Sequence, residues 1–216
     1  MPSSMSVTDK FNRAFGLLPL IGILRGIRPE ESVPVGSALC DLGWQIIEVP
    51  LNSPRPLASI EAMSAALPKA FVGAGTVLTV DDVRNVHAAG GQLVVSPNFN
   101  PAVVRETVRL GMISLPGIIT PSEAFAALEA GASGLKLFPA EMISPLVVKA
   151  WRAVLPPGVL LLPVGGIGSA DMAPWRAAGA SGFGLGSALY KPGMALVDIA
   201  LNASLFIAAN AGRISA

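Results

Sequence analysis

Short apolar runs recur along the whole chain, and a longer stretch of mixed polar and apolar residues separates each run from the next. The eight runs are LIGIL (20–24), WQIIEV (44–49), AFVGAG (70–75), QLVVS (92–96), MISLPG (112–117), GLKLF (134–138), VLLLPV (159–164) and GFGLG (182–186). Each interval has room for a strand, a short loop and a helix. Eight such units are typical of a closed parallel barrel, so the pattern predicts one α/β domain, a (β/α)8 TIM barrel over residues 1–216.

The stretches between the runs carry helix signals. Proline and two carboxylates at 29–31 suit a first helical turn, and Thr79–Asp82 and Thr120–Glu123 resemble capping boxes. Residues 5–17 predict an additional N-terminal helix that covers the bottom of the barrel. An open doubly wound sheet is the competing architecture, but no GxGxxG motif follows the first run and the repeats outnumber those of such a sheet.

Composition raises the question of a membrane protein, because 52% of the residues are hydrophobic and only 13% are charged. The apolar run at 15–24 is too short to span a bilayer and contains Pro19 and Gly22, and no small-residue cleavage site follows it. A net charge of +1 without a basic run argues against a nucleic-acid partner. We therefore expect a soluble protein that binds neither nucleic acid nor membrane.

One cysteine, Cys40, cannot form an internal disulfide and fits a reducing cytoplasm. Its apolar neighbours favour a buried structural thiol. The single histidine, His87, lies in a helical stretch and cannot by itself build a metal site or a catalytic triad. No cluster of His, Asp and Glu follows the apolar runs, so we expect no metal.

Active sites of parallel barrels lie at the C-terminal ends of the strands. Among five lysines only Lys136 lies inside an apolar run, and among fourteen acidic residues only Glu48 does. Alternation along a strand places Lys136 on the face opposite its two leucine neighbours, and Glu48 on the face opposite Val49. If leucine and valine pack against the outer helices, both ionisable groups point into the barrel.

A lysine buried in a strand has a lowered pKa, which an amine nucleophile needs at neutral pH. Arg25, directly after the first run, would lower the pKa further and would bind a substrate carboxylate. Glu48 is then placed to act as general acid and base. The alternative is a Lys136–Glu48 ion pair that only closes the barrel, but buried pairs are weak stabilisers and functional groups gather at this face.

Glycine-rich segments end the last two runs, VGGIGS at 164–169 and GLGS at 184–187. Small residues there let backbone N–H groups approach an anion, helped by the N-terminus of a following helix. Each segment alone also fits a simple tight turn. Their joint position after the seventh and eighth strands favours a phosphate site.

The chain carries a set of motifs in a fixed order: ILRG (23–26), EVPLNSP (48–54), GAGTVL (73–78), SPNFN (96–100), PG (116–117), GLKLFPAE (134–141), VGGIG (164–168) and GLGS (184–187). Over about residues 18–210 this set resembles the family of 2-keto-3-deoxy-6-phosphogluconate and 2-keto-3-deoxy-6-phosphogalactonate aldolases. The resemblance implies a class I aldolase that acts on a phosphorylated 2-keto-3-deoxy sugar acid, works as a homotrimer and needs neither metal nor other cofactor.

The resemblance also implies roles for particular residues. Lys136 would form the Schiff base and Glu48 would be the acid/base. Arg25, Thr76, Pro97 and Pro116 would surround the pyruvyl part of the substrate, and Gly165, Gly166, Gly186 and Ser187 would hold the phosphate.

Two positions favour the galactonate branch of the family. Gluconate members typically carry an arginine in a TLRT-like stretch after the catalytic glutamate, where this chain has PLNSP (50–54), and a threonine where it has Val164. We expect cleavage of 2-dehydro-3-deoxy-6-phosphogalactonate to pyruvate and D-glyceraldehyde 3-phosphate. Gly168, where galactonate members often carry threonine, departs from this pattern. The alternatives are the C4-epimeric gluconate substrate, tolerance of both epimers, or a noncatalytic barrel that binds phosphorylated metabolites.

Overall fold

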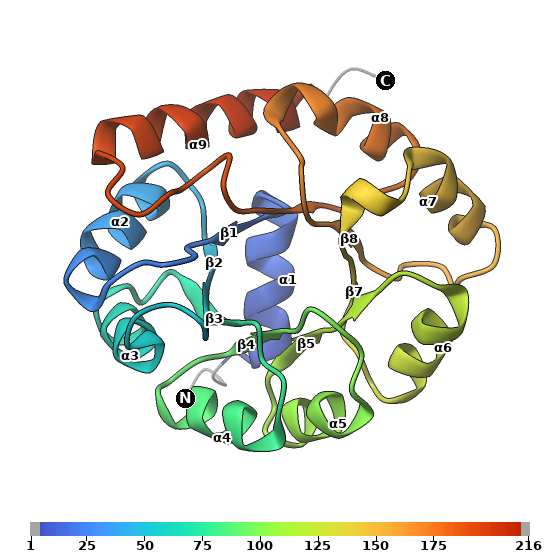
Figure 1. Cartoon of the computed structure of the whole chain (residues 1–216), viewed down its shortest axis with the longest axis horizontal. Helices are drawn as coiled ribbons and strands as arrows, with labels where there is room; N and C mark the ends of the chain where they lie inside the picture. Colours follow the sequence, from blue (N-terminus) through green and yellow to red (C-terminus); the bar gives the residue numbers. More distant parts are fainter. Residues whose placement is uncertain (1–4, 213–216) are drawn as a thin grey trace.

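Two curved sheets of parallel strands, which together we call the ring, lie inside a layer of helices in the computed structural model (Figure 1), which describes residues 5–212. Residues 1–4 and 213–216 of the expected domain lie outside the described residues. Each of the eight apolar runs contains a strand. No helix within residues 5–212 combines the length and the apolar character needed to cross a bilayer.

Strands and helices alternate along the chain after a first helix. The strands are β1 (Leu20–Ile23), β2 (Ile46–Pro50), β3 (Phe71–Gly75), β4 (Leu93–Val95), β5 (Ile113–Leu115), β6 (Gly117–Ile118), β7 (Leu135–Leu137), β8 (Leu161–Pro163) and β9 (Phe183–Leu185). The helices are α1 (Val7–Leu17), α2 (Pro29–Asp41), α3 (Pro56–Ala66), α4 (Val80–Ala88), α5 (Pro101–Arg109), α6 (Pro121–Glu129), α7 (Pro145–Arg152), α8 (Met172–Ala177) and α9 (Leu196–Ala211), with 3₁₀ turns η1 (Ala140–Met142) and η2 (Ser169–Asp171).

The capping residues stand where the sequence places them. The Thr79 and Thr120 hydroxyls each accept a hydrogen bond from the backbone N–H three residues on. The backbone N–H groups of Thr79 and Thr120 in turn donate to the carboxylates of Asp82 and Glu123. Pro29 begins α2 with two glutamates in its first turn. These local signals confirm the expected starts of α2, α4 and α6.

All strand pairs are parallel, as expected for a βα repeat. One sheet has the order β5-β4-β3-β2-β1-β9 and the other the order β6-β7-β8. Only Pro116 separates β5 from β6, so the run at 112–117 holds β5 and the first residue of β6 rather than one strand. At the other junction, Val164 after β8 makes a parallel bridge to Gly184 in β9.

Two apolar cores lie on opposite sides of the strands. The outer core joins alternate strand residues such as Ile47, Val49 and Leu135 to the surrounding helices. The inner core contains the other strand residues, Ile21, Ile46, Phe71, Leu93, Val95, Ile113, Leu115 and Leu162, together with Phe11 and Ala14 of α1. Leucine and valine neighbours of Lys136 and Glu48 therefore pack outward, as the alternation predicts.

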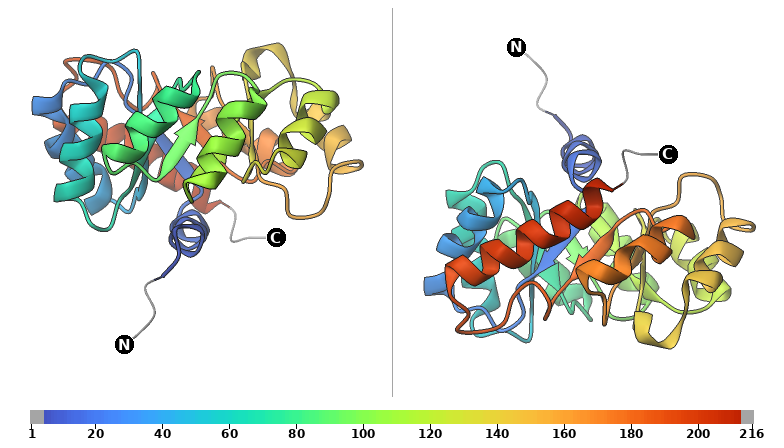
Figure 2. Two further views of the ribbon diagram at one scale, coloured as in Figure 1. Left: turned by 90° about the horizontal axis from the view of Figure 1, so that it is seen from below. Right: turned by 90° about the horizontal axis from the view of Figure 1, so that it is seen from above.

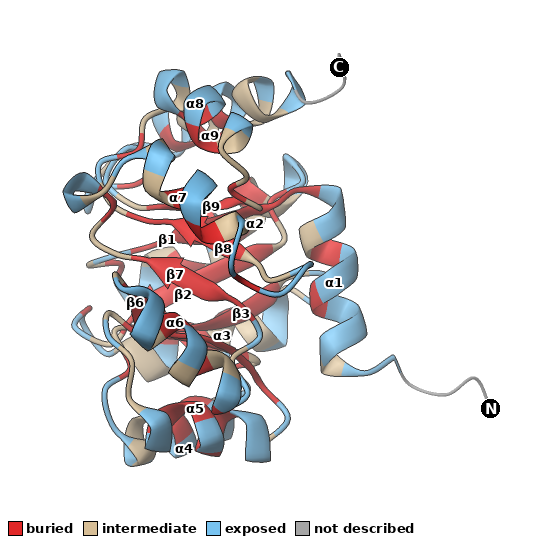
Figure 3. Cartoon of the chain, turned by 90° about the vertical axis from the view of Figure 1, so that its right-hand side faces the viewer, coloured by how far each residue is buried: buried red, intermediate tan, exposed pale blue. Residues whose placement is uncertain are grey.

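Helix α1 covers one end of the ring, away from the helices that surround it (Figures 2 and 3). It contacts β2, β3 and β5. Phe11 is buried and its ring lies 5.5 Å from the rings of Phe15 and Phe71. The helix thus closes the N-terminal ends of the strands with apolar side chains, which agrees with the expected N-terminal helix.

Replacement of Phe11 by alanine should lower the free energy of unfolding by about 3 kcal/mol, because it leaves a cavity where the inner core meets α1. Urea unfolding followed by circular dichroism measures the loss. Leu17→Ala, at a residue of the same helix that is 65% exposed, is the control and should change stability by less than about 0.5 kcal/mol. Equal losses in the two variants would contradict this account of α1.

Candidate active site

Lys136 and Glu48 both project from strands into the ring, above the inner apolar core. Lys136 pairs in register with Leu162 of the inner core and with Gly117. Glu48 shares its face of β2 with the inner-core residue Ile46 and lies in register with Ile23 and Gly73. Only 6% of Lys136 and 2% of Glu48 is exposed.

Burial controls the protonation of both groups. Desolvation raises the pKa of Glu48 to about 7, and the positive charges of Lys136 and Arg25 oppose that rise only in part. Desolvation also lowers the pKa of Lys136; Arg25 lowers it further, while Glu48 acts in the opposite sense. The two shifts move the acid and the amine toward neutral pH, where general acid–base chemistry and nucleophilic attack by an amine are most effective.

No direct ion pair joins these two described side chains within 4.0 Å. The Glu48 Oε2 atom is buried without a hydrogen-bond partner. The Lys136 Nζ atom lies 4.3 Å from the centroid of the Phe138 ring. A pair that only closes the barrel would bring the charges into contact, so this geometry argues against that alternative.

The end of β3 is shaped around the Glu48 carboxylate. A Cβ atom added to Gly75 would lie 1.9 Å from Glu48 Oε2, so only glycine leaves room for the carboxylate. Thr76, the next residue, has φ +57°, a left-handed backbone that is rare for a β-branched residue. Such strained positions cluster at functional sites. Gly75 therefore leaves space for the carboxylate, and Thr76 follows it in a strained conformation.

Pro97 and Pro116 come together at the next strand ends. The Pro116 carbonyl accepts a hydrogen bond of 2.9 Å from the backbone N–H of Lys136. A Cβ on Gly117 would lie 2.3 Å from the Pro97 carbonyl oxygen. Both predicted residues therefore lie in the backbone that surrounds Lys136.

Arg25 follows β1 and is held from the neighbouring loop. Its guanidinium donates a 2.8 Å hydrogen bond to the side-chain oxygen of Asn52, and the backbone N–H of Gly26 donates to the Ser53 hydroxyl. Both acceptors belong to the stretch PLNSP (50–54), where gluconate members of the family typically carry an arginine. Asn52 thus positions Arg25, a role that the sequence alone did not indicate.

A cavity of about 630 Å³ opens beside these groups, and we call it the mouth cavity. Its lining includes six of the predicted residues: Arg25, Val164, Gly165, Gly166, Gly186 and Ser187. The ring of Phe138, which lies under Lys136, also lines it. Its lining does not include the other predicted residues, Lys136, Glu48, Thr76, Pro97 and Pro116.

The two glycine segments lead into different structures. After Gly165 and Gly166, both with positive φ, the chain enters η2 and then α8. After Gly186 and Ser187, however, the next helix begins only at Leu196. The predicted contribution of a following helix to anion binding therefore applies to the first glycine segment alone. In the second segment, only backbone N–H groups could bind the anion.

Glu141 and Tyr190 also line the mouth cavity, and sequence reasoning missed both. The Glu141 carboxylate lies over Gly165 and Gly166: a Cβ on Gly165 would be 2.2 Å from its Oε2 atom. The Tyr190 hydroxyl is buried without a hydrogen-bond partner. Glu141 ends the motif GLKLFPAE, which was a usable signal, whereas nothing in the sequence marks Tyr190.

Side chains that could bind a metal are scattered over the described part of the chain. Within residues 5–212, no group of three or more His, Cys, Asp or Glu side chains is placed to hold a metal ion. Cys40 is a partly buried free thiol, and burial raises its pKa.

Comparison with known proteins places this geometry in a family. The family model of KDPG and KHG aldolases matches residues 12–199. The chain belongs to the KDPG and KHG aldolase family. The predicted family and the predicted enzyme class, a carbon–carbon lyase of the aldolase type, are confirmed.

Two similar proteins and one solved structure carry more specific names. A probable 2-dehydro-3-deoxy-6-phosphogalactonate aldolase of Rhizobium meliloti (strain 1021) is 49% identical over 88% of this chain and 91% of its own. The 2-dehydro-3-deoxy-6-phosphogalactonate aldolase of Escherichia coli (strain K12) is 45% identical over 89% and 94%. A solved structure described as native KDPGal has a TM-score of 0.90 and 43% identity, covering 92% of this chain and 97% of that one.

The raised pKa of Glu48 should appear in the pH dependence of stability. Between about 4.5 and about 7 the folded state keeps a proton that the unfolded state has lost, so the contribution of Glu48 to stability falls as pH rises. The free energy of unfolding of the wild type minus that of Glu48→Gln should fall across this window and stay level above it. Denaturant unfolding at a series of pH values measures the difference.

Glu129→Gln, at an exposed glutamate of α6, controls for the general effect of an added amide. A wild-type advantage that grows between pH 4.5 and pH 7 would be the opposite of this expectation and would refute the burial argument.

Proposed function

We propose that this chain is a class I aldolase that cleaves 2-dehydro-3-deoxy-6-phosphogalactonate, with Lys136 as the Schiff-base lysine. The observation that carries the proposal is the pair of buried groups: among the described residues Lys136 is the one buried lysine, and it lies near the buried, unpaired Glu48 beside the mouth cavity. Family membership and the names of the relatives support the same reaction.

In the proposed reaction, the neutral Lys136 amine attacks the C2 carbonyl of the substrate. Loss of water from the carbinolamine gives an iminium, which accepts the electron pair of the C3–C4 bond. Glu48, through a water molecule, takes the proton of the C4 hydroxyl as that bond breaks and the aldehyde leaves. The enamine is protonated at C3, and hydrolysis of the imine releases pyruvate and restores the amine.

The mouth cavity accommodates the rest of the substrate. Arg25 faces the pyruvyl end, where its guanidinium would bind the carboxylate, and Asn52 fixes its position. Thr76, Pro97 and Pro116 would border the pyruvyl group. The backbone N–H groups of Gly165, Gly166, Gly186 and Ser187 would hold the phosphate, which the glycines let approach closely.

Val164 is the residue that bears on the C4 epimer. Its side chain lines the mouth cavity, and its γ-methyl lies 2.7 Å from where a Cβ on Gly184 would be. A threonine there would offer a hydroxyl to the C4 oxygen, whereas valine offers none. The gluconate epimer and tolerance of both epimers are the alternatives.

We also propose that the two sheets form one closed eight-stranded barrel. The continuity of β5 and β6 through Pro116 and the bridge from Val164 to Gly184 support closure on both sides. Phe125, Met142 and Leu146 are large apolar side chains that stand exposed on α6, η1 and α7, which supports an oligomer of some kind, since such surfaces mark interfaces. The homotrimer itself rests on the resemblance to the family. The single domain and the cytoplasmic location stay predictions.

Borohydride reduction in the presence of pyruvate tests the Schiff base. The wild type should gain one pyruvyl adduct per chain, located on Lys136 by peptide mass spectrometry, because burial makes this amine easy to deprotonate. Lys136→Met should gain none and should lose more than about a thousandfold in kcat, since the covalent route is gone. Lys149→Met, at an exposed lysine of α7, is the matched control.

An adduct on another lysine would overturn the assignment of Lys136. A protein that gains no adduct but still binds the phosphorylated acid would instead favour the noncatalytic barrel.

Val164→Thr tests the epimer assignment. We expect the ratio of kcat/KM for the galactonate substrate to that for the gluconate substrate to fall by roughly tenfold, because the hydroxyl favours one C4 configuration. Coupled assays of pyruvate release on both epimers measure the ratio. Val164→Ala controls for the loss of a valine methyl group without a new hydroxyl. An unchanged ratio in the threonine variant would count against this role.

A further inference from the structure

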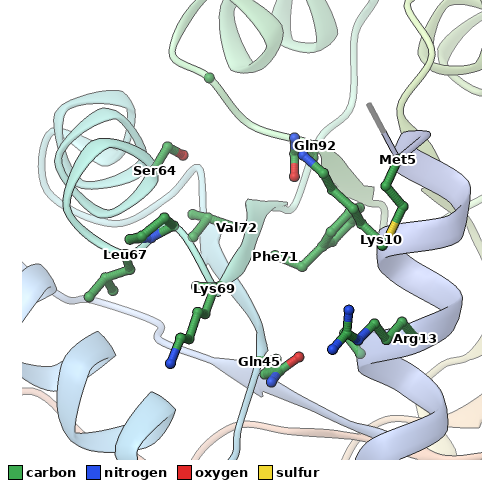
Figure 4. Close-up of a pocket in the computed structure, with 14 residues that line it drawn as sticks. Met5, Lys10, Arg13, Gln45, Ser64, Leu67, Lys69, Phe71, Val72 and Gln92 are labelled. Carbon is green, nitrogen blue, oxygen red and sulfur yellow. The ribbon is translucent and has the colours of Figure 1, made fainter. Parts of the chain in front are cut away.

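A second cavity lies at the opposite end of the strands from the mouth cavity, and we call it the base cavity (Figure 4). Its volume is about 580 Å³, within the range of small-molecule sites. Gln45 just before β2, Phe71 at the start of β3 and Gln92 just before β4 line it, and α1 covers one side. The base cavity therefore lies at the N-terminal ends of the strands, and the proposed reaction makes no use of it.

Three cations face the base cavity. Lys10 and Arg13 extend from one face of α1, and Lys69 extends from the loop before β3. Figure 4 shows Arg13 on one side and Lys69 on the other, with Gln45 between them. No aspartate or glutamate is among the described residues that line it, and no ion pair within residues 5–212 involves any of the three cations.

Neutral hydrogen-bonding groups complete the base cavity. The Ser64 hydroxyl is buried and has no hydrogen-bond partner. The side-chain amides of Gln45 and Gln92 make no hydrogen bond to any described residue. Of these groups only the Ser64 hydroxyl is shut off from water, and a buried hydroxyl without a partner costs free energy unless a ligand meets it.

We propose that the base cavity binds a small polyanion, a metabolite that carries phosphate or clustered carboxylate groups. Three cations without acidic partners, unsatisfied donors and a concave surface of suitable size coincide there. All three cations are exposed residues of the lining, so a polyanion from solution can reach each of them. An anion would pair with the charges of Lys10, Arg13 and Lys69 and accept a hydrogen bond from the Ser64 hydroxyl.

The test uses the full chain in a Ser187→Glu background, which places a carboxylate in the mouth cavity and suppresses anion binding there. Pyrophosphate and citrate are titrated separately by calorimetry at low ionic strength. Arg13→Gln and Lys69→Gln should each weaken binding by roughly tenfold, the loss expected for one charge-assisted contact. Lys149→Gln, at an exposed lysine of α7, is the control and should leave the affinity unchanged.

Hydrogen exchange locates the ligand independently of affinity. Bound anion should slow exchange in α1 and at residues 67–72, with no change at 184–187. Binding of either anion with this pattern supports the proposal, and the stronger ligand identifies phosphate or carboxylate as the preferred group. Absence of binding by both, or affinities that Arg13→Gln and Lys69→Gln leave unchanged, would overturn it.

Discussion

The arrangement of the site depends on the removal of two ionisable groups from water without a direct contact between them. Lys136 and Glu48 project from strands that are buried on both faces, so each meets a low dielectric rather than solvent. Had they met in an ion pair, attraction would have held both in their charged forms. Their separation instead lets desolvation dominate, which leaves Glu48 close to its midpoint at neutral pH and favours a neutral amine on Lys136.

The residues around Lys136 and Glu48 give each of the two groups its own surroundings. Gly75 gives the Glu48 carboxylate a place that any larger residue would fill, and Phe138 presents its ring to the Lys136 amine. Thr76 holds a left-handed conformation at the end of the same strand. These positions follow from the needs of the ionisable groups rather than from the stability of the strands, which glycine and a strained threonine would weaken.

Local patterns predicted most of the fold. The strand positions, the capping boxes at Thr79 and Thr120 and the inward direction of Lys136 all depend on residues within a few positions of each other. The break between β5 and β6 at Pro116 was harder to predict. Proline lacks the N–H that a strand ladder needs, but it is also tolerated at the end of a strand, so its presence in the run does not show whether the strand continues.

Among the residues that line the mouth cavity, several at strand ends were predicted, whereas two that distant segments bring there were missed. Glu141 lies over Gly165 and Gly166 only because η1 and the end of β8 fold against each other. Tyr190 reaches the mouth cavity from a loop of irregular backbone. No periodicity relates such residues to the glycines they face, so local patterns in the sequence could not join them.

The inner core has a further consequence for the order of events in the proposed reaction. Buried apolar side chains fill the ring between the base cavity and Lys136: Ile21, Ile46, Phe71, Leu93, Ile113 and Leu162. In the proposed reaction, water would therefore reach the lysine from the mouth cavity rather than through these side chains, along the route by which the aldehyde product would leave. Bulk water would then reach the imine by that route after the aldehyde has left, whereas the water molecule at Glu48 takes part in the cleavage step.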